Sequence, residues 1–228
     1  MHIEVQHGPA YALAIAHLGA DESLVAEAGA MVSHDANVAM ETSTNATGKK
    51  KGGLLGGLKR ALAGESFFQN KFTANGGAGT VTLAPTHCGD VVVQELGQRT
   101  LFLQSTAFIC SGMGVEIDAK WGGARTFFGG EGLIMLKATG SGPIAFNAFG
   151  GIKEIDVDGT FVVDTGHIVA FEEGVEFSVN RFGGGWKSFI FGGEGLVCTF
   201  SGRGKVWIQT RNPQAYGEAV GGKLPPRD

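Results

Sequence analysis

Apolar and polar residues alternate along most of the chain, in short runs that glycine-rich turns separate. Alternation with a period of two residues is typical of β-strands that turn one face toward a core. Near the start, Ile3–Val5 and Ala10–Leu18 alternate in this way on either side of a turn at residues 7–9. Farther on, Asp90–Leu96 and Leu101–Gln104 do the same. The pattern predicts an all-β protein with little helix.

One stretch of this pattern occurs three times. Phe127–Gly150 closely matches Phe189–Asn212 and, more loosely, Leu62–Pro85. The copies share one Gly-Glu pair and a later Gly-x-Gly turn, after which alternation resumes. The Gly-Glu pairs are Gly64-Glu65, Gly130-Glu131 and Gly193-Glu194, and the Gly-x-Gly turns begin at Gly77, Gly140 and Gly202. A long stretch that recurs within one chain indicates a repeat architecture, in which neighbouring units cover each other's apolar faces.

The repetition extends upstream, because Gly29, Thr106 and Gly166 each begin a similar four-residue motif that is followed nine residues later by valine. Each unit therefore holds roughly four strands, and the units span about residues 20–86, 100–150 and 160–212. We predict one domain, residues 1–216, of three antiparallel β units in a sandwich- or barrel-like body around a pseudo-threefold axis. Residues 217–228, rich in Gly, Pro and charge, are predicted to be a flexible tail. Asp158-Gly159, between two alternating runs, predicts a tight hairpin.

Unit one carries an insertion between its last upstream strand and its Gly-Glu pair that the other units lack. The insertion contains no acidic residue and five basic ones, which are Lys49, Lys50, Lys51, Lys59 and Arg60. Leu54–Leu62 is predicted to form a helical turn or two. A positive segment with apolar anchors is typical of chains that contact an anionic membrane surface. The alternative, which we favour, is a solvated loop whose leucines cover the edge of unit one.

Composition favours self-association and argues against nucleic acid as a partner. Charged residues make up only 18% of the chain, and its mean hydropathy is slightly positive, at +0.09. Such a surface predicts a homo-oligomer, with a trimer or a multiple of it favoured. The net charge of −4 disfavours nucleic-acid binding, which depends on clustered Lys and Arg. With neither a signal peptide nor an apolar run long enough to span a membrane, the expected compartment is the cytoplasm.

Candidate chemistry is sparse. Glu65, Glu131 and Glu194 could converge on a cation, but we favour three carboxylates that each fix a glycine turn, since active sites usually survive in one copy. The six histidines show no metal-binding spacing. His167, beside Asp164, is the best single chemical candidate, although a hydrogen-bonded turn histidine is favoured. We predict no catalytic residue, no metal and no cofactor.

Two further residue types have an ordinary structural explanation. Cys110 and Cys198 lie in apolar strands and are predicted to be buried, and with Cys88 they show no CxxC spacing. Trp207 lies near Arg203 and other basic residues, a combination that could stack a nucleic-acid base. We instead predict that Trp207 lies in the core or in a subunit interface.

Several longer motifs resemble one family. HGPAYALAIAHL, AEAGAMVSHDANVAMET, VDTGHIVAFEEGVEF and FGGEGLVCTFSGRGKVWIQTRNP, together with the basic insertion, resemble bacterial members of the altered inheritance of mitochondria protein twenty-four family over nearly the whole chain. The resemblance implies a fold like that of the tryptophan RNA-binding attenuation proteins, a short double-stranded β-helix. It does not carry RNA binding to this chain, and bacterial members of the family have no established activity.

Together these features predict a non-enzymatic binding or scaffolding protein that associates with itself, in the cytoplasm or peripheral to a membrane. The alternative is a small-ligand- or metal-binding protein, or an enzyme, with its site between the units.

Overall fold

The computed structural model describes residues 1–43, 69–118, 134–181 and 196–225. Within these ranges the chain is mostly β-strand, with two short 3-10 helices, η1 (Ser105–Ala107) and η3 (Thr165–His167), and one α-helix, α4 (Pro213–Gly221). All strand pairs in its sheets are antiparallel, and the sheets do not close into a barrel. This confirms the predicted all-β class with little helix and a sandwich-like body.

The strands fall into three sets that pair in the same way, which we call units one, two and three. Unit one contains β2 (Leu13–Leu18), β3 (Ser23–Glu27), β4 (Met31–His34), β5 (Val38–Ser43), β6 (Gln69–Ala74) and β7 (Gly79–Leu83), preceded by β1 (His2–Gln6). Unit two contains β8 (Val91–Glu95), β9 (Leu101–Gln104), β10 (Phe108–Gly112), β11 (Val115–Asp118), β12 (Met135–Gly140) and β13 (Pro143–Asn147). Unit three contains β14 (Ile152–Asp164), β15 (Ile168–Glu172), β16 (Val175–Arg181) and β17 (Leu196–Gln209).

In unit three two long strands replace four short ones. The prediction of a hairpin at Asp158-Gly159 is wrong, because β14 continues through these residues and pairs with β17 over its whole length. Gly159 lies opposite Gly202, and both have a positive φ, near 110°. The two glycines let the paired strands bend together where unit two has a turn between β12 and β13.

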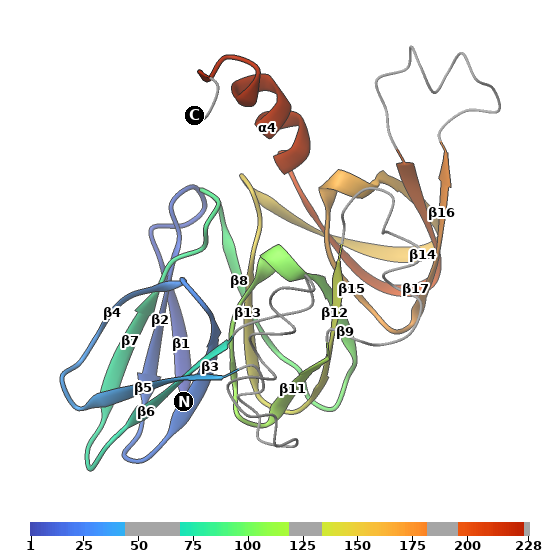
Figure 1. Ribbon diagram of the computed structural model, residues 1–228. Helices are drawn as coiled ribbons and strands as arrows, with labels where there is room; N and C mark the ends of the chain where they lie inside the picture. The colour runs from blue at the N-terminus through green and yellow to red at the C-terminus, as the bar shows by residue number, and fades with distance from the viewer. Residues whose placement is uncertain (44–68, 119–133, 182–195, 226–228) are drawn as a thin grey trace.

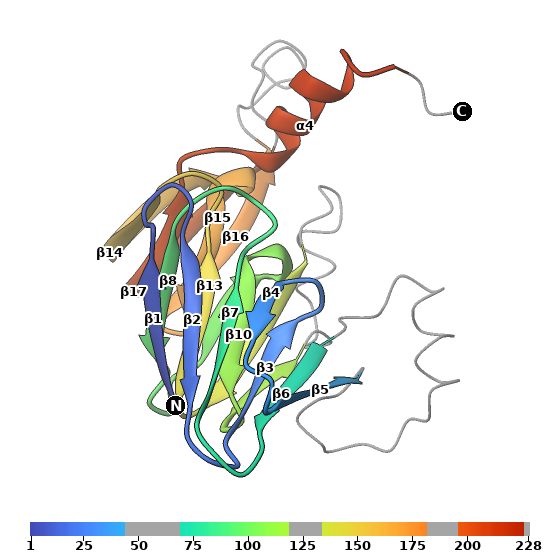
Figure 2. The same ribbon diagram turned by 90° about the vertical axis from the view of Figure 1, so that its left-hand side faces the viewer.

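Neighbouring units share a sheet. β10 of unit two pairs with β3 of unit one, and β15 of unit three pairs with β9 of unit two. The sheet shared by units one and two has six strands in the order β5-β6-β3-β10-β13-β8. The sheet shared by units two and three has seven, in the order β11-β12-β9-β15-β17-β14 with β16 also paired to β17, and unit one has a further four-stranded sheet, β1-β2-β7-β4. The units lie in a row from left to right in Figure 1, and Figure 2, viewed along that row, shows unit one in front of unit three.

The row is open. Among the described strands no pair joins unit one to unit three, so the predicted pseudo-threefold arrangement within one chain is wrong. A threefold body would need a third junction equivalent to the two that exist. Instead, β4 ends the four-stranded sheet of unit one, and β14 ends the seven-stranded sheet that unit three shares with unit two.

The core fills the space between the sheets. Phe171 contacts the rings of Phe102 and Phe200 at centroid distances of 5.1 and 5.2 Å, and Trp207 meets Phe146 edge to face at 5.7 Å. The prediction for Trp207 is confirmed, since its side chain is buried. A buried ring is not available to stack a nucleic-acid base.

The two cysteines predicted to be buried are buried. Burial raises the pKa of the Cys110 and Cys198 thiols to about 12, because the apolar surroundings disfavour the thiolate. Neither is a candidate nucleophile, since a thiol reacts as its thiolate.

The C-terminal segment contains the helix α4, which includes residues 217–221 of the predicted tail. Asn212 caps α4 by accepting hydrogen bonds from the backbone N–H of Gln214 and Ala215, and Pro213 occupies the first turn. The helix extends to Gly221 and projects from the body in both views, with no buried residue of its own (Figures 1 and 2).

Candidate functional site

The residues singled out at the glycine turns and in the basic insertion lie outside the described residues. These are Gly64, Glu65, Gly130, Glu131, Gly193 and Glu194, and Lys49, Lys50, Lys51, Lys59 and Arg60. Their roles stay predictions. In the described part of the chain, no group of three His, Cys, Asp or Glu side chains is placed to hold a metal ion.

His167 has a structural contact. Its Nδ1 lies 2.7 Å from the backbone oxygen of Gln209, and the Asp164 carboxylate accepts a hydrogen bond from the N–H of Gly166 at 2.7 Å. The His167 contact holds the η3 turn against β17, as the favoured interpretation of His167 predicts, and the Asp164 contact caps the turn itself. The two side chains therefore fix a turn.

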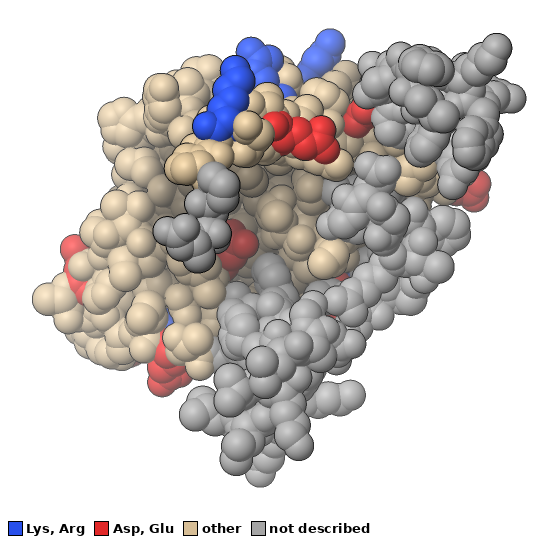
Figure 3. Space-filling model, turned by 45° about the horizontal axis from the view of Figure 1, so that its top comes forward, with Lys and Arg blue, Asp and Glu red and all other residues tan. Residues whose placement is uncertain are grey.

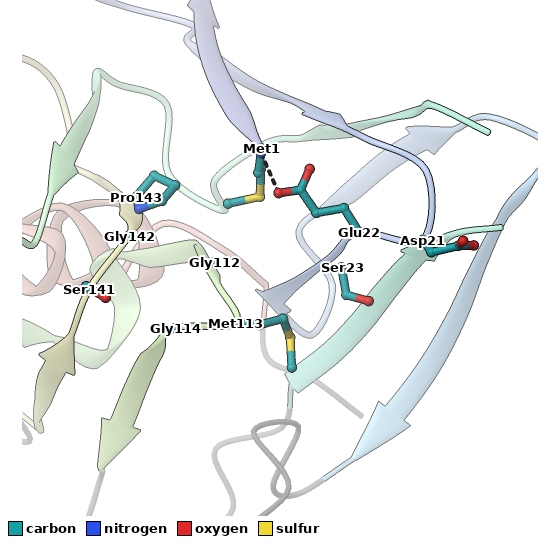
Figure 4. A pocket seen from close by; sticks show the side chains of 10 residues that line it. All are labelled: Met1, Asp21, Glu22, Ser23, Gly112, Met113, Gly114, Ser141, Gly142 and Pro143. Carbon is teal, nitrogen blue, oxygen red and sulfur yellow. Dashed lines mark hydrogen bonds and ion pairs between the residues drawn. The ribbon is translucent and has the colours of Figure 1, made fainter. Parts of the chain in front are cut away.

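A pocket of about 400 Å³ lies at the junction of units one and two, between the turn before β3 and the turns that end β10 and begin β13 (Figure 4). The Met1 ammonium and the Glu22 carboxylate form an ion pair on its wall. At the equivalent place between units two and three, Arg99 and Glu172 form an ion pair at 2.8 Å. We interpret the pocket as a space between turns; at the junction of units two and three, the side chains of Arg99 and Glu172 fill the equivalent space.

The two ends of the row are the most unusual surfaces in the described structure. At one end β4 pairs only with β7, and at the other the C-terminal half of β14, residues 160–164, pairs only with β17. We call these segments the β4 edge and the β14 edge. An unpaired strand edge exposes a row of backbone N–H and C=O groups that can pair with another strand.

The β4 edge is exposed where its equivalents are buried. Met31 and Val32 are 37% and 55% exposed. The register of strand pairing aligns them with Phe108 and Ile109 in β10 and with Ile168 and Val169 in β15, all four of which are 0% exposed. The difference arises because β10 and β15 pair on both sides, whereas β4 pairs on one.

The β14 edge shows the same contrast. Val162 is 53% exposed, whereas Val25 in β3 and Phe102 in β9, which hold the equivalent position, are 0% and 7% exposed. The neighbours of Val162, Phe161 and Val163, are half-buried, but their equivalents are buried. In each end unit, the exposed apolar side chains therefore lie on the strand whose equivalents in the other units pair with a neighbouring unit.

Neither edge has the features that usually protect a free strand. Natural edges carry charged residues, proline or a bulge that prevents pairing. The N-terminal half of β14 follows this rule with Lys153, Glu154, Asp156 and Asp158, but residues 160–163 are Thr-Phe-Val-Val. β4 has a register shift between Met31 and Ser33, yet β10 and β15 have the same shift and still pair on both sides.

Sequence reasoning did not find these edges. Met31, Val32 and Val162 look like ordinary strand residues in the alternating pattern, and their exposure depends on which strands lie beside them. The one available signal was the repeat itself. A unit at the end of a row has no neighbouring unit to cover the residues whose equivalents are buried in the other copies.

The comparisons with known proteins agree with this fold. The sequence profile of the family described as "Mitochondrial biogenesis AIM24" matches residues 3–211. An uncharacterized protein of Streptococcus pyogenes serotype M6, M6_Spy0233, is 32% identical over 207 residues, which are 89% of this chain and 83% of that protein. The crystal structure of SPYM3_0169 from Streptococcus pyogenes superposes with a TM-score of 0.78 at 28% identity, covering 98% of this chain and 99% of the other. The chain therefore belongs to the AIM24 family, as its motifs indicated.

A search of the described residues for a helix long and apolar enough to cross a membrane finds none.

Proposed function

We propose that this protein is a non-enzymatic binding or scaffolding protein that works as a homo-oligomer, for which we favour a trimer or a multiple of it. One observation supports this above the others. Met31, Val32 and Val162 expose large apolar side chains at positions where the equivalent residues of the other units are almost completely buried. Self-association gives these side chains the cover that a neighbouring unit gives their equivalents.

One face of the molecule supports the same proposal. In Figure 3 the part of the surface over unit one carries few acidic or basic side chains. Burying one Val or Met completely stabilises by about 1.5–3 kcal/mol. Association costs roughly 4–15 kcal/mol of translational and rotational freedom, so three side chains alone are not enough and the backbone hydrogen bonds of the free edges must contribute.

The mass in solution tests the proposal. Multi-angle light scattering at micromolar concentration should give a multiple of the 23.7 kDa chain, with three copies or a multiple of three expected. A mass of one chain across the concentration range would overturn it.

The competing function is a site for a small ligand or metal between units. A thermal-shift screen with metal ions and a ligand library distinguishes it, because a specific ligand at a hundredfold excess over its Kd stabilises the protein by about 2.7 kcal/mol. A ligand with that effect would favour the competing function.

Contact with an anionic membrane surface remains a separate proposal, supported by the five basic residues and the leucines of the insertion. Vesicles containing phosphatidylserine should bind the protein at low salt and release it at high salt. Changing Lys49, Lys50, Lys51, Lys59 and Arg60 to Gln should abolish that binding; binding that ignores these changes would count against the proposal.

A further inference from the structure

The two end units carry complementary halves of one sheet. Each complete sheet joins three strands of one unit to three of the next, as β5-β6-β3 joins β10-β13-β8 and β11-β12-β9 joins β15-β17-β14. In the order of the complete sheets, the half at one end is β16-β17-β14 and the half at the other is β4-β7-β2, extended by β1. Each half lacks the three strands that the other has.

The register of the missing junction follows from the two that exist. Ser111 lies opposite Val25 at the first junction, and Phe171 lies opposite Phe102 at the second. On the β4 edge, His34 is equivalent to Ser111 and Phe171. On the β14 edge, Val162 is equivalent to Val25 and Phe102, so His34 and Val162 should lie opposite each other. The neighbouring pairs give Ser33 opposite Val163 and Asp35 opposite Phe161 by the same rule.

We infer that copies of this chain join head to tail, with the β4 edge of one copy pairing antiparallel with the β14 edge of the next, so that their two half sheets form a six-stranded sheet. This inference rests on the proposed self-association and names its surfaces and register. The occupant of each edge is a second copy, because the pairing continues a junction that the chain already makes twice. Each copy uses two different surfaces, so the assembly is a ring if the rotation closes and a filament if it does not.

Blocking one edge at a time tests the head-to-tail arrangement. Val32→Lys places a charge on the β4 edge, and Val162→Lys places one on the β14 edge; both positions are more than half exposed, at 55% and 53%, so neither change is expected to disturb folding. Each variant alone should be monomeric, since every junction needs both edges. An equimolar mixture should give a dimer of one copy of each variant, because one intact β4 edge and one intact β14 edge remain.

The alternatives give different masses. If β4 edges paired with each other, Val162→Lys would still dimerise on its own, which would overturn the inference. Met40→Lys is the matched control, because Met40 is 46% exposed on the edge strand β5 and has no role in the junction. This control should keep the mass of the parent.

Cross-linking tests the register independently of the blocking variants. In a Cys88→Ser background, which removes the exposed native thiol, His34→Cys mixed with Val162→Cys should form an intermolecular disulfide. Met40→Cys mixed with Val162→Cys should not. Suppose that the parent is oligomeric, the cross-link fails and Val32→Lys keeps the parent mass: the inference is then wrong, and the proposed self-association stands. A monomeric parent would overturn both the inference and the proposed self-association.

Discussion

Gly89 lies where the link between units one and two runs parallel to the link between units two and three. It forms an isolated bridge with Gly150, and its carbonyl accepts a hydrogen bond from the N–H of Ala12 at 3.0 Å. A Cβ atom at this position would lie 1.9 Å from the backbone oxygen of Ala148, which is far too close. The site requires glycine because the obstacle is backbone and has no rotamer to change.

We therefore expect Gly89→Ala to lower the free energy of unfolding by about 2–3 kcal/mol, the upper range for overpacking. For a chain of this size the midpoint of thermal unfolding should fall by roughly 5–10 °C at a fixed protein concentration. Gly217→Ala is the control, since a Cβ there meets nothing within 4 Å and alanine favours the helix. Equal midpoints for the two variants would contradict the crowding argument.

Glu27 at the end of β3 gives a prediction about pH. Burial raises the pKa of its carboxyl from 4.5 to about 7, and no cation of the described residues forms an ion pair with it. A raised pKa in the folded state means that the folded protein binds more protons than the unfolded chain between pH 4.5 and 7. The free energy of unfolding should therefore fall as pH rises through that window.

Glu27→Gln should remove this decrease in the free energy of unfolding between pH 4.5 and 7. Unit two already has Gln104 at the equivalent position, so an uncharged amide is compatible with the strand. We expect the variant to unfold at a higher temperature than the parent at pH 8 and at nearly the same temperature at pH 4. Glu41→Gln, on an exposed side chain, should follow the parent at both values. A variant as pH-dependent as the parent would refute the assignment.

At the scale of elements, the sequence predicted strands well and connections less well. β1, β8 and β9 lie within one residue of the expected runs, and β2 begins three residues later than expected, because alternation reports which face of a strand is buried. The hairpin at Asp158-Gly159 failed because the same dipeptide that favours a turn also permits a bend within two paired strands. The helix α4 was missed although Asn212-Pro213 is a helix start signal, because a short exposed helix leaves little apolar pattern.

The stability of α4 should depend on its cap. Asn212→Ala removes two hydrogen bonds, of 2.9 and 3.2 Å, to the first turn, which costs about 1 kcal/mol. Since the helix buries no residue, amide exchange in residues 216–221 should accelerate about fivefold while exchange in β17 stays unchanged. Lys223→Gln, beyond the helix end, is the control. Unchanged exchange in the helix would show that the cap does not hold it.

At the scale of the whole molecule, the arrangement of the strands could not be predicted from the sequence. Triplicated motifs suggested a closed threefold body, whereas β4 and β14 end an open row. The sequence of each strand is compatible with either arrangement. What distinguishes them is that Met31 and Val162 lack the cover that Phe108 and Val25 receive, which becomes visible only when the neighbours of each strand are known.

An assembly that covers these edges should make thermal stability depend on concentration. Binding that involves only the folded state stabilises it by about 2.7 kcal/mol when the partner is at a hundredfold excess over Kd. At about 2–4 °C per kcal/mol for a chain of this length, the midpoint of the parent should rise by several degrees between 1 and about 100 times its Kd. Val32→Lys should unfold at one temperature throughout that range, and Met40→Lys should rise with the parent. Scanning calorimetry across a concentration series measures this directly, and superimposable curves for the parent and Val32→Lys would show that the β4 edge is not covered by another copy.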